Sequence, residues 1–255
     1  MNLSPRNRFQ DFFEEKKYVV LKNYLYNYLL RKRAVEKNLQ AEKLGLILEV
    51  GSGISPVMTR NDHIVYTDLS LLGLRILRTD QRKGLYVVAD GMCLPFKSGI
   101  FAHSIYSEVL EHLQDDRQAL REMSRVLKPS GELIVTFPHR EIYFTNDDYF
   151  VKHFRRYELH DMVDRLQTVG LMPVSIQKVL GPLEKITMSF AVFCFSLIQR
   201  YKCIKSREAE MSPFMKIFAF LFKWANRLYA GLAWLDARVS PRSLAAVLLI
   251  RAIKR

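Results

Sequence analysis

Two short segments of the chain combine residue types that could bind a nucleotide-like ligand. Glu49, Gly51 and Gly53 follow an apolar run, and glycines there let the backbone turn sharply and bring bare N–H groups close to a ligand. Asp68 follows the next apolar run, where a carboxylate can accept hydrogen bonds from both hydroxyls of a ribose. Nicotinamide and flavin enzymes use a similar pair, and a tight turn beside a surface aspartate gives the same pattern. These residues alone therefore leave the ligand open.

Three histidines are candidate acid–base groups, because an imidazole titrates near neutral pH. They are His112, His139 and His153. Each could instead be a structural or substrate-orienting residue. Next to His153, Arg155, Arg156 and Tyr157 could hold a phosphate or sugar hydroxyls, or could simply form ion pairs in a loop.

Alternating apolar runs and helical stretches predict the elements that would position these residues. Strands are predicted over 46–50, 64–67, 85–89, 101–106, 133–137 and 173–179, and helices over 71–77, 115–127 and 158–169. Pro56 could open a further helix, and the run 244–253 is predicted to be a seventh strand rather than a short helix. The pattern indicates an α/β fold, with a mostly parallel seven-stranded sheet and helices on both faces. The carboxyl edge of that sheet would bring the candidate residues together.

Five segments, in order, resemble the motifs of class I S-adenosylmethionine-dependent methyltransferases with a methyltransferase type 11-like domain. They are ILEVGSGISP, YTDLS, VVADGMCLPF, FAHSIYSEVLEHL and REMSRVLKPSGELIVTFP, within residues 44–180. Two positions depart from the pattern, since Ser55 replaces a third glycine and Ala102 replaces a frequent aspartate. The resemblance implies a Rossmann-like core and S-adenosyl-L-methionine as cofactor.

The resemblance also assigns cofactor contacts by position. It implies that Glu49, Gly51 and Gly53 hold the amino-acid end of the cofactor, and that Asp68 holds the ribose. The remaining implied contacts lie beside the adenine or near the sulfonium and the acceptor: Asp90, Gly91, Met92, Ser107 and Glu108. Alignment and desolvation can supply most of the acceleration in methyl transfer, but a hydroxyl acceptor still benefits from a base. The three histidines are the candidates for that role.

The charge distribution predicts surfaces for an anionic partner. The formal net charge is +13, from 39 Lys and Arg against 26 Asp and Glu. Residues 1–43, a predicted basic helical segment, hold ten basic and five acidic residues, and residues 181–255 hold thirteen and four. The excess therefore sits at the two ends, outside the core at 44–180, and suits a membrane surface or a nucleic acid, although a generally basic solvated surface is the alternative.

Residues 181–242 have a different character and are predicted to be an amphipathic helical insertion before the final strand at 243–255. The stretch 186–198 is thirteen residues without a charge, too short for a bilayer, which needs about 20. In 214–235 the charges of Lys216, Lys223 and Arg227 fall within about 40° on a helix otherwise rich in apolar and aromatic residues. Such a helix could lie in a membrane interface, with Trp224, Tyr229 and Trp234 at headgroup depth, or could form a lid or cap that stays in water.

The cysteines and the N-terminal residues indicate in which cellular compartment the protein is expected. Cys93, Cys194 and Cys203 are scattered without a nearby histidine, so no disulfide framework, zinc site or other metal is expected. The first residues lack the apolar core of a secretory signal. We therefore expect a cytoplasmic protein, peripheral on the inner face of the membrane.

Taken together, the residues predict a methyltransferase that acts on a hydrophobic small molecule, a lipid or a lipid-linked glycan. An RNA methyltransferase is the alternative enzyme, less favoured because the aromatic residues of the insertion are mingled with Leu, Ile and Met rather than with a basic track. A non-catalytic scaffold that binds the cofactor is the alternative outside enzymes.

Overall fold

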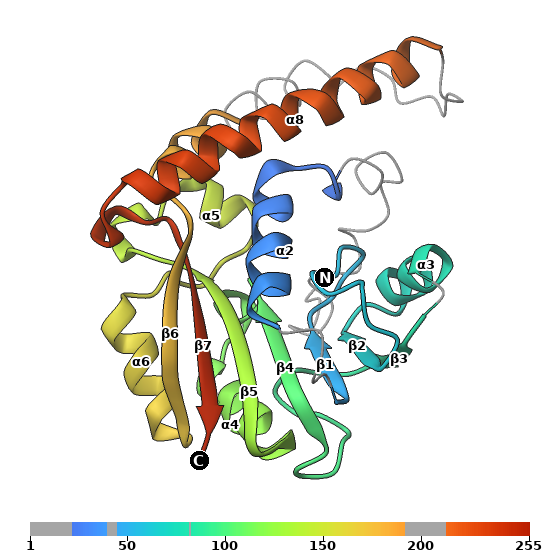
Figure 1. Cartoon of the computed structure of the whole chain (residues 1–255), viewed down its shortest axis with the longest axis vertical. Coiled ribbons are helices and arrows are strands. Elements are labelled where there is room, and N and C mark those ends of the chain that lie inside the picture. Colours follow the sequence, from blue (N-terminus) through green and yellow to red (C-terminus); the bar gives the residue numbers. More distant parts are fainter. Residues whose placement is uncertain (1–21, 40–44, 82, 192–212) are drawn as a thin grey trace, which may run out of the picture.

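The computed structural model describes residues 22–39, 45–81, 83–191 and 213–255, and side chains of the last range from residue 220 onward. Its centre is a seven-stranded sheet with the order β3-β2-β1-β4-β5-β7-β6 (Figure 1). The strands are β1 (Ile47–Val50), β2 (Ile64–Asp68), β3 (Leu85–Val88), β4 (Phe101–Ser107), β5 (Leu127–Pro138), β6 (Leu171–Leu180) and β7 (Val247–Lys254). Strands β1 to β5 pair in parallel, whereas β7 runs antiparallel to β5 and β6. The mostly parallel sheet and the final strand predicted from the sequence are confirmed.

Helices cover both faces of the sheet, as a parallel sheet requires because both faces are apolar. On one face α4 (Asp116–Val126) and α6 (Leu159–Thr168) bury Leu120, Met123 and Leu166 in one core cluster. On the other face α2 (Tyr26–Asn38) and α3 (Leu71–Gln81) bury a second cluster. Short helices complete the fold: η4 (Leu110–His112), η5 (Glu141–Tyr143), α5 (Asn146–Phe150) and η6 (Arg242–Leu244).

The prediction that a helix begins at Pro56 is wrong. No helix forms between residues 51 and 63, and the Glu49 carboxylate accepts hydrogen bonds from the backbone N–H groups of Val57 (2.7 Å) and Met58 (3.1 Å). The α2 helix packs beside this irregular loop, where the Tyr28 hydroxyl donates to the carbonyl of Pro56 at 2.8 Å. A buried carboxylate and a helix from earlier in the chain therefore replace the expected helical turn.

The described part of the insertion lies over one edge of the sheet. The predicted helix at 214–235 is confirmed as α8 (Pro213–Val239), which Figure 1 shows crossing that edge above α2 and α5. Residues 183–191 are helical, while the rest of the predicted 186–198 segment lies outside the described residues, as do residues 1–21 and 40–44, Cys194 and Cys203. Within the described ranges, no helix combines the length and hydropathy needed to cross a bilayer.

Candidate active site

A cavity of about 410 Å³ lies at the carboxyl edge of the parallel strands, within the size range of small-molecule sites. The loops after β1, β2 and β4 line it from the sheet, and α2 and residues 183–191 line it from the opposite side. Of the residues predicted for the site, the structure brings these around the cavity: Glu49, Gly51, Gly53, Asp68, Gly91, Ser107, Glu108, His112 and His153. Asp90, Met92 and His139 lie outside its lining.

The turn after β1 requires its glycines. Gly51 and Gly53 adopt φ of 69° and 52°, in the left-handed region that L side chains rarely occupy. A Cβ on Gly51 would also lie 2.5 Å from a methyl group of Val109. The N–H groups expected to be bare are paired, because Gly51 and Ser52 donate to the carbonyl of Thr67, at 2.8 and 3.1 Å. The turn therefore offers close approach to a ligand rather than a set of free donors.

Glu49 holds this turn from behind. It is almost fully buried, and each of its carboxylate oxygens accepts a backbone N–H from the loop that follows. Burial raises the pKa of Glu49 to about 7, although these hydrogen bonds act in the opposite direction. Glu49 thus lines the cavity while its oxygens fix the shape of the loop.

Asp68 stands at the end of β2 with its carboxylate oriented by two backbone groups. Its oxygens accept from Gly53 N and Ser70 N, each at 2.8 Å. Burial raises the pKa of Asp68, and these hydrogen bonds and the charge of Lys22 oppose that rise. Burial likewise lowers the pKa of Lys22 to about 8. Lys22 lines the same cavity and was not predicted as a site residue.

The turn after β3 orders the next part of the lining. The Asp90 carboxylate accepts from Met92 N at 2.9 Å, and the Tyr106 hydroxyl donates to the carbonyl of Gly91 at 3.0 Å. A Cβ on Gly91 would lie 3.1 Å from that hydroxyl oxygen and 3.2 Å from a methyl group of Val50, so a glycine lets the turn pack closely against these two side chains. Asp90 therefore stabilises this turn through its hydrogen bond to Met92, although Asp90 itself does not line the cavity.

These features fit S-adenosylmethionine. Two turns, at Gly51 and Gly91, line the cavity with glycine backbone. The carboxylate of Asp68 lies between them in strand order, where a ribose would be expected. The chemistry of this half of the cavity is therefore that of a nucleoside-containing ligand.

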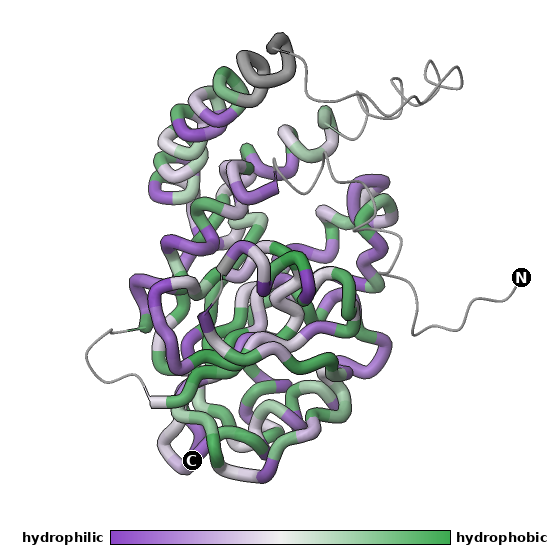
Figure 2. The backbone as a smooth tube through the Cα atoms, turned by 90° about the vertical axis from the view of Figure 1, so that its right-hand side faces the viewer, coloured by the Kyte–Doolittle hydropathy of each residue, from purple (hydrophilic) through white to green (hydrophobic). Residues whose placement is uncertain are grey.

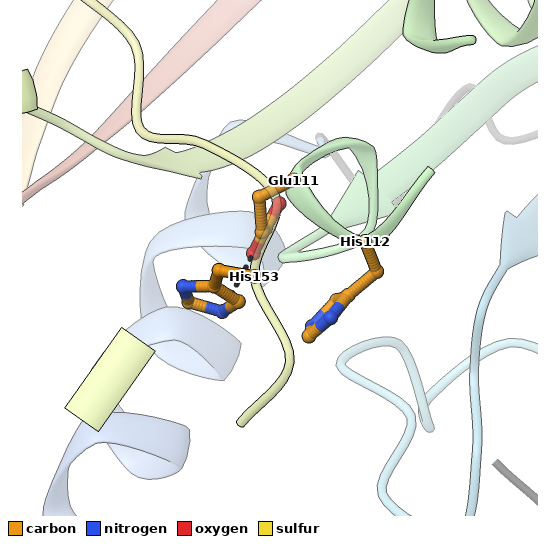
Figure 3. Close-up of side chains that lie close together, drawn as sticks. All are labelled: Glu111, His112 and His153. Atoms are coloured by element: carbon orange, nitrogen blue, oxygen red, sulfur yellow. Dashed lines mark ion pairs between the residues drawn. The ribbon is translucent and has the colours of Figure 1, made fainter. Parts of the chain in front are cut away.

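The other half of the cavity is built from ionisable side chains. Figure 3 shows Glu111 and His112 from η4 facing His153, which lies in the loop after α5. The backbone N–H of Phe154 donates to the carbonyl of Glu111 at 2.8 Å and so joins the two segments. The rings of His112 and His153 meet edge to face with centroids 4.7 Å apart.

Asp148 organises the charges around His153. Its carboxylate lies 2.8 Å from His153 Nδ1, 2.8 Å from Arg156 Nε and 3.0 Å from Lys185 Nζ. Burial alone would raise the pKa of Asp148, but the bond to His153 and the charge of Arg156 hold it below its ordinary value. Arg156 is therefore a partner of Asp148, and Lys185 ties the insertion to the core.

His139 and two neighbours of Arg156 have structural partners. His139 is buried, with Nδ1 2.8 Å from the carbonyl of Ala245. Arg155 and the hydroxyl of Tyr157 both bond to the carboxylate of Asp116, at 2.9 and 2.8 Å. Arg155 and Arg156 form the ion pairs that were one of the two interpretations of this segment, and Arg156 also lines the cavity.

Sequence reasoning missed several charged residues of the cavity. They are Lys22, Arg31, Asp147, Asp148, Glu184 and Lys185. Arg31 of α2 approaches Glu108 at 3.8 Å, and the Tyr26 hydroxyl bonds to Glu184. The basic character of residues 1–43 was the only available signal, and it does not say which residues face the cavity.

Comparison with known proteins supports this assignment. Residues 48–135 match the family model described as a methyltransferase domain. The chain is 32% identical over 110 residues to a demethylmenaquinone methyltransferase of Streptomyces griseus subsp. griseus, covering 42% of this chain and 48% of the relative. It is 33% identical over 63 residues to norajmaline N-methyltransferase of Rauvolfia serpentina, covering 24% of this chain and 22% of that protein. The chain thus spans about half the length, or less, of these relatives.

Solved structures share the fold over nearly the whole chain. A SAM-dependent methyltransferase from Thermotoga maritima superposes with a TM-score of 0.63 at 18% identity, covering 98% of this chain and 100% of that one. Phosphoethanolamine N-methyltransferase 2 of Haemonchus contortus, in complex with S-adenosyl-L-methionine, gives a TM-score of 0.58 at 15% identity, covering 96% and 60%. Residues 48–135 are thus identified as a methyltransferase domain, and the chain as a whole has the sheet order and fold of S-adenosylmethionine-dependent methyltransferases.

Proposed function

We propose that this protein transfers a methyl group from S-adenosylmethionine to a hydrophobic, lipid or lipid-linked glycan acceptor at a membrane surface. The observation that carries the proposal is an exposed apolar stripe on α8, the helix that crosses the cavity edge of the sheet (Figure 1). An acceptor that resides in a membrane would then meet the enzyme on the side where the cavity lies.

The stripe consists of residues spaced three or four apart, which places them on one face of the helix. They are Leu221, Trp224, Leu228, Leu232, Leu235 and Val239, between 51% and 77% exposed. Ala233 and Ala237 are buried on the packed side of the helix, and Figure 2 shows polar and apolar positions interleaved along it. A helix with one apolar face turned to solvent matches an interfacial helix.

The charges and aromatic residues of α8 refine the sequence prediction. Arg227 is exposed, whereas the Nζ of Lys223 lies 4.0 Å from the ring centroid of Tyr24. Tyr229 points inward, where its ring meets that of Tyr26 with centroids 4.7 Å apart, so it serves packing rather than a headgroup. The apolar stripe is therefore a sharper feature to test than the charges.

The relatives support a lipid-like acceptor. Several are named demethylmenaquinone methyltransferases, and we infer from this an acceptor of similar hydrophobic character. The cavity is closed by elements that differ from the matched domain at 48–135, namely α2 and residues 183–191, so acceptor choice would lie with these caps.

In the reaction, the cofactor supplies a methyl group on a positively charged sulfur. The bond from that carbon to sulfur breaks with its electron pair staying on sulfur, a bond to the acceptor atom forms, and the acceptor gives up a proton. Gly51, Gly53 and Asp68 would hold the cofactor in line, while the buried surroundings exclude water. His153, oriented by Asp148, is positioned to receive the acceptor proton.

Methyl transfer is tested with a total lipid extract and cofactor labelled in the methyl group. We expect mass spectrometry to find a labelled lipid product that depends on the enzyme. A parallel reaction with total RNA tests the alternative acceptor, and label only in RNA would overturn the proposal.

Membrane contact is tested by co-sedimentation with anionic liposomes. The triple variant Trp224→Ser, Leu228→Ser, Leu232→Ser should lose most binding, because each buried apolar side chain contributes about 1.5 to 3 kcal/mol. A matched control, Leu85→Ser with Ile142→Ser, removes exposed apolar side chains elsewhere and should bind as the wild type does. Equal sedimentation of all three proteins would remove the support that α8 gives.

A further inference from the structure

Three potential metal ligands converge beside the cavity, where η4 meets the loop after α5. One ligand atom from each of Glu111, His112 and His153 lies within 4.8 Å of the others (Figure 3). They come from two segments, η4 and the loop after α5, that are far apart in the sequence. His112 and His153 also line the cavity.

Glu111 lacks the partners that a buried carboxyl group needs. The residue is 0% exposed, and among the residues that the structure describes neither of its carboxyl oxygens has a hydrogen-bond partner. Leaving a polar group of this kind unsatisfied costs several kcal/mol, and native structures rarely do so. Its Oε1 lies 3.8 Å from His153 Nε2, which leaves space between the two atoms.

The two imidazoles have the properties of metal ligands. His153 bonds through Nδ1 to Asp148, so its Nε2 is directed toward Glu111, as in carboxylate–histidine–metal arrangements. His112 lines the cavity, and its ring meets that of His153 edge to face with centroids 4.7 Å apart, so the two imidazoles can reach the same ion.

We propose that Glu111, His112 and His153 bind a divalent transition-metal cation such as Mn²⁺ or Zn²⁺. Two imidazoles and one carboxylate suit these ions and leave coordination positions open toward the cavity. Glu108, whose Oε1 also lacks a hydrogen-bond partner, lines the same cavity and supplies a second negative charge nearby. The proposal revises the expectation from the sequence, which sought metal ligands among cysteines and found none.

A cation at this position would act on the acceptor side of the reaction, and His153 would then hold the cation instead of receiving the acceptor proton. Because two of its ligands line the cavity, an oxygen of the acceptor can take an open coordination position and be polarised there. This consequence rests on the proposed function, whereas the metal site itself does not.

The metal site is tested on the full chain after chelator treatment and desalting. Titration with MnCl₂, followed by loss of the free Mn²⁺ electron paramagnetic resonance signal, should show one bound ion per chain. CoCl₂ should give the visible absorption bands that are typical of Co²⁺ coordinated by nitrogen and oxygen ligands. The single variants Glu111→Gln, His112→Gln and His153→Gln should each weaken Mn²⁺ binding at least 10-fold, a loss of about 1.4 kcal/mol or more.

The control is His160→Gln, which changes an exposed histidine outside the cluster and should bind Mn²⁺ as the wild type does. Calorimetry with S-adenosylhomocysteine on the same samples separates the two proposals, since cofactor binding should persist in every variant. No binding of Mn²⁺, Co²⁺ or Zn²⁺ by the wild type would overturn the metal site, as would equal binding by the three ligand variants. If one of the three variants at the proposed metal ligands does not fold, the titration of the wild type and of the other two variants still tests the metal site.

Discussion

The two halves of the cavity are held together in different ways. On the cofactor half, carboxylates are fixed by backbone groups a few residues away, as with Asp68 and Ser70 or Glu49 and Val57. On the acceptor half, Asp148 joins His153 and Lys185, and His153 faces Glu111 from a distant part of the chain. The carboxylates of the cofactor half accept from backbone groups, whereas Asp148 contacts side chains, one of them Lys185, which is 37 residues away. The contacts of Asp148 with Lys185 and of His153 with Glu111 exist only once the whole fold has closed.

This difference also concerns charge. Backbone N–H groups stabilise the carboxylates of the cofactor half through hydrogen bonds. The loss of one of these contacts removes a single hydrogen bond. On the acceptor half, buried ions compensate one another, so removing one leaves others unpaired in a medium of low polarity. Substitutions on the acceptor half should therefore have the larger effects.

The largest effect is expected for His153. The variant His153→Ala should lower kcat by about 10² to 10⁴, whether the imidazole acts as a base or as a metal ligand, while the affinity for S-adenosylhomocysteine stays unchanged. Labelled product formation at saturating cofactor measures it. His139→Ala is the matched control and should keep its rate, because His139 lies outside the cavity lining. Equal losses in both variants would mean that the acceptor half has been assigned wrongly.

The next largest effect concerns stability. Asp148→Ala should lower the free energy of unfolding by about 3 to 5 kcal/mol, because Arg156 and Lys185 would each lose a buried partner. Urea denaturation followed by circular dichroism measures the change. Asp62→Ala breaks an exposed pair with Lys83 and should cost at most about 1 kcal/mol. Similar costs for the two variants would contradict the contrast between the halves.

On the cofactor half, Asp68→Ala should weaken binding of S-adenosylhomocysteine by about 1 to 3 kcal/mol, since ribose hydroxyls would lose their acceptor. Calorimetry on the folded variant measures the affinity, and Asp62→Ala again serves as the control. An unchanged affinity would show that the cofactor lies elsewhere in the cavity.

The smallest effect is a pH dependence. Burial lowers the pKa of His139, so below its unfolded value of about 6.5 the unfolded chain takes up a proton that the folded chain does not. The free energy of unfolding should therefore fall as the pH drops through that value, by at most about 1.4 kcal/mol per pH unit from this residue. In His139→Gln the slope between about pH 7.5 and about pH 5.5 should be smaller. An identical slope in wild type and variant would show that His139 is protonated equally in both states.

The sequence alone predicted the elements whose signals are local. Apolar runs ending at Glu49 and Asp68 placed the first two strands, and the run near the C-terminus was correctly assigned to a strand rather than a helix. Glu49, Gly51, Gly53, Asp68 and Gly91 follow from the same motifs, because each lies within a few positions of a strand end, whereas Lys22 beside them does not. The prediction of a helix after Pro56 was wrong, because the motif does not show that the Glu49 carboxylate accepts hydrogen bonds from the backbone N–H groups of Val57 and Met58.

Only the tertiary structure decided the acceptor half. His139 and His153 look alike as sequence candidates, yet Nδ1 of His139 lies 2.8 Å from the carbonyl of Ala245, whereas Nε2 of His153 lies 3.8 Å from Glu111. Lys185 reaches Asp148 from an insertion that has no motif of its own. Such contacts depend on how α2, α5 and the insertion close over the sheet, and long-range packing of this kind leaves no periodic signal along the chain.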